Sequence, residues 1–336
     1  MGNSSDVSNV NGSMTYNHAL LGEDMEVQKL LQEHIENSKA VGAVVGFIDQ
    51  GQVKYFSYNK KSASPLVSEE SIFEIGSITK VFTTLMLMEM VHDGKMQLDD
   101  HIEMYLPGVG LKIPQMDAMK ITLHHLATHT SGLPCLPDNF DPKNPSNPYA
   151  DYSKEKLYQF LNCYTLQRLP GKQYEYSNLG MGILGHILSL KSGKSYEEIV
   201  SDICKKIGMK NTVITLDSER KKLLVKGHHE GSEVENWDLD VLEGAGALRS
   251  DIRDMTLFLA ANMGMINTVL YESLKNCHIA QFECEESRDS TGKIALKLGL
   301  GWHVLCSKDS EVVFHNGRTG GCRSFLGFNP KEQKGL

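Results

Sequence analysis

Strand-like segments lie near both ends of this chain, and the long stretch between them is mostly helical. The apolar run 41–48 and the segment 53–58 flank a glycine-containing turn, which is the pattern of a β-hairpin. Toward the C-terminus, 312–314 and 324–328 are strand-like and are joined by a glycine-rich turn. This order predicts an α+β fold in which a sheet made from both ends of the chain carries an inserted helical domain.

The same pattern predicts the domain boundaries. Residues 1–22 are polar and rich in Ser and Asn, which predicts a flexible tail. Segments 23–75 and 290–336 are expected to form one discontinuous α/β sheet domain, and 76–289 a mainly helical domain. A chain of 336 residues has room for about two such domains.

Three helices are expected in the middle of the chain. The segment 78–92 is apolar on most faces, which predicts a buried helix, and 179–190 has the same character. A shorter helix is expected at 123–130. Between them, 134–150 holds many of the prolines and predicts a long surface loop.

Charge and cysteine content narrow the class of protein. Lys and Arg number 34 against 42 Asp and Glu, a net charge of −8, so the basic excess typical of nucleic-acid binders is absent. No apolar run reaches the length of a membrane span. The seven cysteines form no C-x-x-C pair and the chain shows no secretory signal, which together predict free thiols and a cytoplasmic location.

The first chemical motif is a serine followed three residues later by a lysine. Ser77 and Lys80 stand at the start of the apolar helix and lie on the same helix face. A serine hydroxyl becomes a good nucleophile when a base takes its proton, and a lysine with a lowered pKa can be that base. The alternative is that Ser77 caps the helix and Lys80 lies on a solvated face.

The second motif precedes another apolar helix. Tyr176 close to a lysine could become a phenolate base, because a positive neighbour lowers a tyrosine pKa. Asn178 offers an amide that can hold both a lysine and a substrate carbonyl. The alternative is a core aromatic residue followed by a helix cap.

The third motif, 315–321, directly follows the strand at 312–314 and reads His-Asn-Gly-Arg-Thr-Gly-Gly. Glycines there allow a ligand to approach the backbone closely. The alternative is an ordinary hairpin turn.

In this order and context, S-x-x-K, Y-x-N and H-x-G resemble the serine β-lactamase and penicillin-binding protein family. The resemblance is closest to its class C-like branch, which includes class C β-lactamases, D-alanyl-D-alanine carboxypeptidases, D-amino acid peptidases and family VIII esterases. Further segments typical of this branch are 73–80, 93–100, 121–133, 170–180 and 244–250. The resemblance implies an antiparallel sheet flanked by helices, with the motifs at the interface with an all-helical insert.

The resemblance also implies roles for individual residues. Ser77 would be the acylated nucleophile, with Lys80 sharing the proton transfer and Tyr176 acting as the general base for acylation. Which of Lys80 and Tyr176 takes the first proton stays open. Asn178 would orient Lys80 and bind substrate.

The third motif would supply the rest of the substrate site, through His315, Asn316, Gly317 and Arg318. The backbone N–H groups of Ser77 and Arg318 would form the oxyanion hole. Most β-lactamases have lysine where this chain has His315, so this position resembles carboxypeptidases, aminopeptidases and esterases more closely. The Arg318 guanidinium could bind a substrate carboxylate.

The predicted function is therefore a serine hydrolase that forms an acyl-enzyme on Ser77. Its substrates would be esters, peptides ending in a D-residue or, less efficiently, β-lactams. No metal or cofactor is expected: His125 and His129 are spaced like metal ligands, but no acidic residue completes the pattern, which favours structural roles. The alternative is a catalytically silent binding or scaffolding protein of the same fold.

The C-terminal end departs from the family pattern. The resemblance implies that a further strand and a covering helix should follow the third motif, and the chain stops at Leu336 as that strand should begin. A sheet without them would expose an edge. Besides a small-molecule or peptide substrate, an oligomer or a second chain that completes the sheet is therefore an expected partner.

Overall fold

The computed structural model describes residues 15–16, 22–61, 63, 65–108, 110–284 and 294–336. Most of the expected tail 1–22 lies outside the described residues. Within it, Thr15–Tyr16 form the short strand β1, which pairs in parallel with the strand beginning at Gln52. The first helix begins at Gly22.

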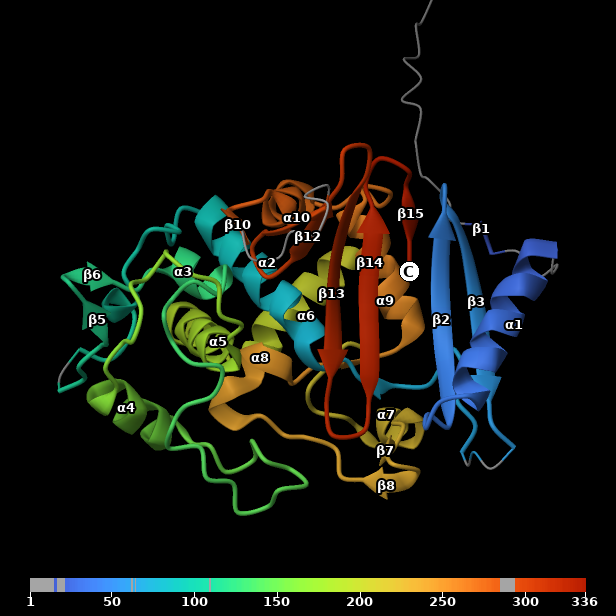
Figure 1. The fold of residues 1–336 in the computed structure, drawn as a ribbon, viewed down its shortest axis with the longest axis horizontal. Coiled ribbons are helices and arrows are strands. Elements are labelled where there is room, and N and C mark those ends of the chain that lie inside the picture. The colour runs from blue at the N-terminus through green and yellow to red at the C-terminus, as the bar shows by residue number, and fades with distance from the viewer. Residues whose placement is uncertain (1–14, 17–21, 62, 64, 109, 285–293) are drawn as a thin grey trace, which may run out of the picture.

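A nine-stranded sheet forms one side of the molecule (Figure 1), in the order β1-β3-β2-β15-β14-β13-β12-β11-β10. All its pairings are antiparallel except that of β1 with β3. Its other strands are β2 (Gly42–Asp49), β3 (Gln52–Asn59), β10 (Phe282–Glu283), β11 (Ala295–Leu298), β12 (His303–Cys306), β13 (Glu311–Arg318), β14 (Arg323–Asn329) and β15 (Lys334–Gly335).

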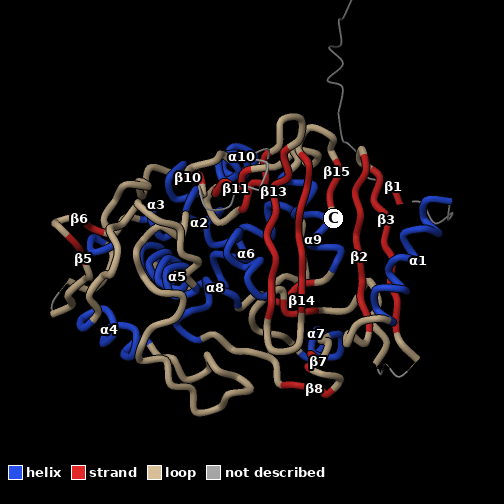
Figure 2. The backbone as a smooth tube through the Cα atoms, viewed as in Figure 1, coloured by secondary structure: helices blue, strands red, loops and turns tan. Residues whose placement is uncertain are grey.

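Helices make up most of the other side, as the blue segments in Figure 2 show. The α-helices are α1 (Gly22–Glu36), α2 (Thr79–His92), α3 (Leu123–Ala127), α4 (Lys154–Cys163), α5 (Asn178–Ser192), α6 (Tyr196–Ile207), α7 (Ser218–Leu223), α8 (Glu243–Gly246), α9 (Ile252–Asn262) and α10 (Tyr271–His278). The 3-10 helices are η1 (Gly76–Ile78), η2 (Ile102–Met104) and η3 (Asp240–Leu242). Short two-stranded pairs join β4 (Phe73–Glu74) to β9 (Arg249–Ser250), β5 (Gln115–Met116) to β6 (Met119–Lys120) and β7 (Gly227–His229) to β8 (Ser232–Val234).

Helices cover the sheet on both faces, which confirms the predicted α+β fold. On one face, the β3 residue Tyr55 shares a hydrogen bond of 2.9 Å with Thr256 of α9. On the other, Lys54 donates a hydrogen bond of 2.6 Å to Asp24 of α1. Adjacent residues of a strand point to opposite faces, so the two helices sandwich this part of the sheet. The division into two interleaved domains remains a proposal.

The last strand lies inside the sheet. β15 pairs with β14 through Phe328 and Asn329, and with β2 through Ile48 and Asp49. The strand expected to begin where the chain stops is thus present as two residues, and it pairs with only two residues of each neighbouring strand. The strand has begun, and it joins the N-terminal hairpin to the C-terminal strands, because the two ends of the chain meet in the middle of the sheet.

Helix α2 is buried on nearly all sides, as its apolar sequence predicts. The Phe82 ring stacks on Phe258 of α9, with centroids 4.1 Å apart. Thr84 donates a hydrogen bond of 2.8 Å to the carbonyl of Leu300, just before β12. This central helix therefore fixes the position of η1, which leads directly into it.

Close packing of α5 against α8 depends on a glycine. A Cβ atom on Gly185 would come within 2.8 Å of the Gly244 Cα atom, so no larger residue fits without a shift of the backbone. The approach brings α8, and with it the carbonyl of Ala245, next to the start of α2.

Candidate active site

Ser77 lies in η1, immediately before α2. The preceding residue, Gly76, has φ +49° and a Cβ there would lie 2.8 Å from the backbone nitrogen of Arg318. Glycine is therefore needed both for its conformation and for the close approach of the two segments. As a result the end of β13 packs against the turn that carries Ser77, whose side chain is only half-buried.

Lys80 is fully buried on the first turn of α2, three residues after Ser77. Its Nζ donates hydrogen bonds to Ser77 Oγ at 3.1 Å, to Asn178 Oδ1 at 2.7 Å and to the Ala245 carbonyl at 2.7 Å. The alternative of a solvated lysine is therefore wrong. All three ammonium protons have an acceptor, which allows the charged form to exist at a buried position.

Burial lowers the pKa of Lys80 to about 7, because the ammonium loses its hydration. The protonated and free-base forms are then similarly populated near neutral pH. The free base has a lone pair that can accept the Ser77 proton. The sequence-based expectation of a lysine with a lowered pKa is confirmed.

Tyr176 lies over this lysine, with its ring centroid 4.8 Å from Lys80 Nζ. The expectation that the positive neighbour lowers the Tyr176 pKa is wrong. Burial, the largest cause, raises the pKa of this phenol, and the hydrogen bond with Ser77 lowers it only in part. Burial disfavours the phenolate, and this effect is larger than the effects that favour it. Tyr176 is therefore a protonated phenol at neutral pH.

Asn178 is the first residue of α5 and links Lys80 to the wall of the site. Besides accepting from Lys80, its amide donates a hydrogen bond of 3.3 Å to the Tyr149 hydroxyl. The Tyr149 ring in turn lies 5.3 Å from that of Trp237. Ser177, rather than Asn178, caps the helix, by accepting from the N–H of Gly180 at 2.8 Å.

The third motif forms the end of β13. His315 is buried and its Nδ1–H donates to the Asn316 carbonyl at 2.7 Å. Burial holds the pKa of His315 well below its usual value, so this imidazole is neutral at pH 7. A Cβ on Gly317 would come within 2.1 Å of the Ile75 carbonyl, whereas Asn316 and Arg318 are exposed.

Further aromatic and imidazole rings pack around Tyr176. The His129 ring lies 4.7 Å from that of Tyr176, and its Nδ1 accepts from the Ser177 N–H at 3.1 Å. Tyr174 and His303 share a hydrogen bond of 3.2 Å on the same side. Burial lowers the pKa of His129 and His303, so both are neutral and add no charge beside Lys80.

The structure thus brings together Ser77, Lys80, Tyr176 and Asn178, with the end of β13 beside them. Sequence reasoning missed the contacts of Ala245, Tyr149 and Tyr174. For His129 the sequence favours a structural role over a metal site but gives no contact with Tyr176, although His129 lies in the family-like segment 121–133 and Ala245 in 244–250. The resemblance of these two segments to the family was the sequence signal that could have identified His129 and Ala245 as site residues. Among the described residues, no group of three or more His, Cys, Asp or Glu side chains could hold a metal ion.

Glu74, which sequence reasoning also missed, forms hydrogen bonds with two segments next to the site. Its carboxylate accepts from the Thr319 hydroxyl at 2.7 Å and from the Trp237 N–H at 2.5 Å. It lies 3.9 Å from the guanidinium of Arg249. The turn after β13 and the segment at Trp237 are therefore held by one buried carboxylate.

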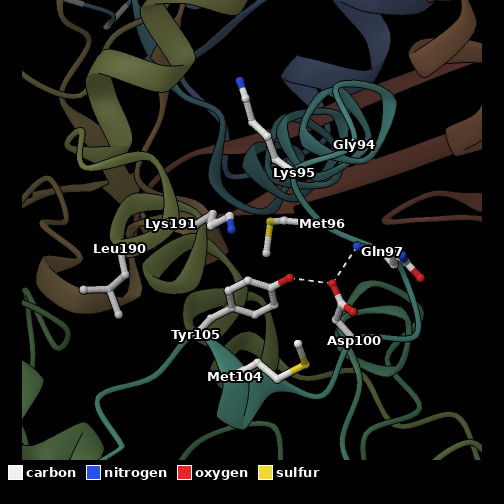
Figure 3. A pocket seen from close by; sticks show the side chains of 9 residues that line it. All are labelled: Gly94, Lys95, Met96, Gln97, Asp100, Met104, Tyr105, Leu190 and Lys191. Atoms are coloured by element: carbon white, nitrogen blue, oxygen red, sulfur yellow. Dashed lines mark hydrogen bonds between the residues drawn. The ribbon is translucent and has the colours of Figure 1, made fainter.

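A cavity of about 550 Å³ lies elsewhere, in the helical region (Figure 3). It is lined by Gly94, Lys95, Met96, Gln97, Asp100, Met104, Tyr105, Leu190 and Lys191. Tyr105 donates a hydrogen bond of 2.5 Å to Asp100, and Lys191 Nζ lies 5.4 Å from the Tyr105 ring centroid. None of the sequence-predicted site residues lines it.

No helix in the described part of the chain combines the length and apolar character needed to cross a bilayer.

Comparison with known proteins agrees with this geometry. The D-alanyl-D-alanine-carboxypeptidase/endopeptidase AmpH of Escherichia coli K12 is 27% identical over 314 residues, covering 89% of this chain and 78% of AmpH. A Beta-lactamase of Pseudomonas fluorescens is 26% identical over 288 residues, covering 84% of this chain and 73% of that protein.

Solved structures show the same fold. A Beta-lactamase/D-alanine carboxypeptidase from Yersinia pestis, complexed with citrate, superimposes with a TM-score of 0.79 at 28% identity, covering 92% of this chain and 90% of that one. A class C β-lactamase from Rhodobacter sphaeroides gives 0.75 at 20% identity, covering 90% of each chain.

The model of the Beta-lactamase family matches residues 27–336, nearly the whole chain. The match includes every segment that contributes to the site. The protein therefore belongs to the Beta-lactamase family, as its three motifs predict.

Proposed function

We propose that the protein is a serine hydrolase that forms an acyl-enzyme on Ser77. The observation that carries this proposal is the buried Lys80, whose Nζ lies 3.1 Å from Ser77 Oγ and whose pKa is lowered to about 7. The names of its relatives favour D-residue peptides and β-lactams as substrates. Esters are a third class that the same chemistry would cleave.

In the proposed acylation, Lys80 in its free-base form takes the Ser77 proton while Oγ attacks the substrate carbonyl carbon. Tyr176, which is protonated, then donates its proton to the leaving nitrogen or oxygen as the carbon–heteroatom bond breaks, and it recovers a proton from Lys80. The proposal takes Lys80 as the first base, because burial raises the Tyr176 pKa and lowers that of Lys80. Water reverses the sequence to release the acyl group.

The negative charge that develops on the carbonyl oxygen would be held by backbone N–H groups of Ser77 and Arg318. The contact of Gly76 with the backbone of Arg318 supports this, because it places the two segments side by side. Donors fixed in this way stabilise the transition state without reorganising, and each is worth about 10²–10³ in rate.

Mass spectrometry tests the proposal. The intact protein, incubated with a fluorophosphonate or with benzylpenicillin, should gain one covalent adduct on Ser77. Ser77→Ala should gain none, and Ser192→Ala, which removes an exposed hydroxyl at the end of α5, should react like the wild type. Absence of an adduct from every serine-reactive probe would contradict the proposal and favour a silent binding protein.

A further inference from the structure

In the described part of the chain, the arginines are paired with carboxylates except at one place. Four of the six arginines in the described part of the chain form an ion pair. Those pairs are Arg168–Glu175, Arg220–Asp217, Arg249–Asp238 and Arg253–Glu69. The remaining two, Arg318 and Arg323, have no carboxylate partner among the described residues, although both are exposed and the chain carries an excess of acidic groups.

These two arginines are direct neighbours. Arg318 ends β13 and Arg323 begins β14, and they are paired residues of the antiparallel ladder. Side chains of such a pair leave the same face of the sheet with Cβ atoms about 5 Å apart, and like charges at that spacing repel. A ligand that carries two negative charges would remove this repulsion, because each guanidinium can bind one oxygen pair.

The pair lies beside the candidate nucleophile. The backbone of Arg318 contacts Gly76, which precedes Ser77. The next cross-strand pair on the same face, Asn316 with Phe325, adds an exposed amide and a phenyl ring that is 50% exposed. A substrate bound along the end of β13 would therefore meet two cations, an amide donor and an apolar surface.

Within residues 315–323, Arg318 and Arg323 are the side chains with a permanent positive charge. His315 is buried and neutral, and Lys80 is buried with all its protons engaged. Arginine does not lose its proton at any physiological pH. In the described segment 315–323, charge recognition would thus depend on Arg318 and Arg323.

We propose that Arg318 and Arg323 together bind a dianionic group of the substrate, either two carboxylates or a phosphate, at the turn end of the β13–β14 hairpin. This inference rests on the proposed hydrolase function, which it refines. The expected substrate is an ester or peptide that carries such a group next to the bond that Ser77 attacks.

Two p-nitrophenyl esters test the inference. One is the mono-ester of tricarballylic acid, which has two free carboxylates, and the other is the neutral butyrate. The measured quantity is the ratio of their kcat/KM values. Arg323→Gln should lower this ratio about tenfold, and Arg323→Glu should lower it further. Lys331→Gln removes one exposed positive charge from the β14–β15 turn, where Lys331 has no ion pair with a described residue, and should leave the ratio unchanged. An unchanged ratio in both Arg323 variants would overturn the inference.

A binding measurement separates this inference from the proposed function. Calorimetric titration of Ser77→Ala protein with tricarballylate or glycerol phosphate needs no catalysis. The inference predicts saturable binding that weakens about tenfold when Arg323→Gln is added. Failure of Ser77 to acylate would contradict only the hydrolase proposal, whereas absence of binding, or binding that Arg323→Gln does not weaken, would contradict the inference. The stronger of the two ligands identifies the type of dianion.

Discussion

The candidate site has two cationic regions, which differ in burial and in hydrogen bonding. Lys80 is fully buried and has three hydrogen-bond acceptors around one nitrogen. Arg318 and Arg323 are exposed and, among the described residues, have no carboxylate partner. Burial makes the lysine charge variable, since its pKa falls to about 7, while the arginine charges stay permanent.

The difference separates two tasks. A group that must gain and lose a proton in each cycle benefits from a pKa near the working pH. A group that recognises an anion must keep its charge and leave its donors free for the ligand. Lysine in the core and arginine at the hairpin end therefore suit proton transfer and substrate recognition respectively.

The largest expected effect comes from making the buried cation permanent. Lys80→Arg keeps a positive charge but cannot act as a base, so acylation of Ser77 should fall about 10²–10⁴-fold. The burst of p-nitrophenol release from a neutral ester measures this rate.

A buried guanidinium could also disturb folding, so Lys80→Met serves as a second variant of similar length without charge. It should fold, as near-ultraviolet circular dichroism would show, and lose acylation to a similar extent. Lys331→Arg, at an exposed lysine, is the matched control and should be fully active. Acylation of Lys80→Met within tenfold of the wild-type rate would show that Lys80 is not the base.

An intermediate effect is expected from pH. Only the free base of Lys80 can take the Ser77 proton, so kcat/KM should rise with pH up to a plateau above about 7 and fall about tenfold per pH unit below it. His315 should leave no inflection between pH 6 and 8, because its pKa is held well below its usual value.

The ratio of rates for the dianionic and neutral esters should stay flat above pH 7, because a guanidinium group keeps its positive charge in proteins. A pH profile that rises only near the usual lysine pKa would contradict the shift. A ratio that follows the Lys80 titration would assign charge recognition to Lys80 instead of the arginines.

The smallest effect is expected from salt. The Debye length shortens from about 10 Å at 0.1 M to about 3 Å at 1 M ionic strength, which screens exposed charges and leaves buried ones nearly unaffected. Raising NaCl over this range should lower the dianionic-to-neutral rate ratio about three- to fivefold. The rate for the neutral ester should change little, and Arg323→Gln should flatten the salt dependence. A salt effect of equal size on both esters would contradict the assignment of anion recognition to the exposed arginines.

Local sequence determined much of this protein. The three-residue spacing of Ser77 and Lys80 on one apolar helix placed both on a single face, because helical geometry is local. The two hairpins and the buried helices follow from patterns of two and 3.6 residues, which also depend only on neighbours in the chain. Tyr176, Asn178 and His315 were candidates because the order of their motifs resembles that of the serine β-lactamase family.

Tertiary structure decided what these residues can do. The Ala245 carbonyl, far along the chain from Lys80, reaches it only because Gly185 lets α8 approach α5. The direction of the Tyr176 pKa shift depended on burial, which motif spacing does not reveal, so the sequence-based expectation had the wrong sign.

Register and strand order were likewise beyond the sequence alone. Arg318 and Arg323 become paired charges through the ladder between β13 and β14, and β15 joins the two ends of the chain inside the sheet. Sequence patterns specify which residues favour a strand or a helix face, because those preferences are local. The fold alone determines which distant groups share one desolvated site, and that shared environment sets their charge and their chemistry.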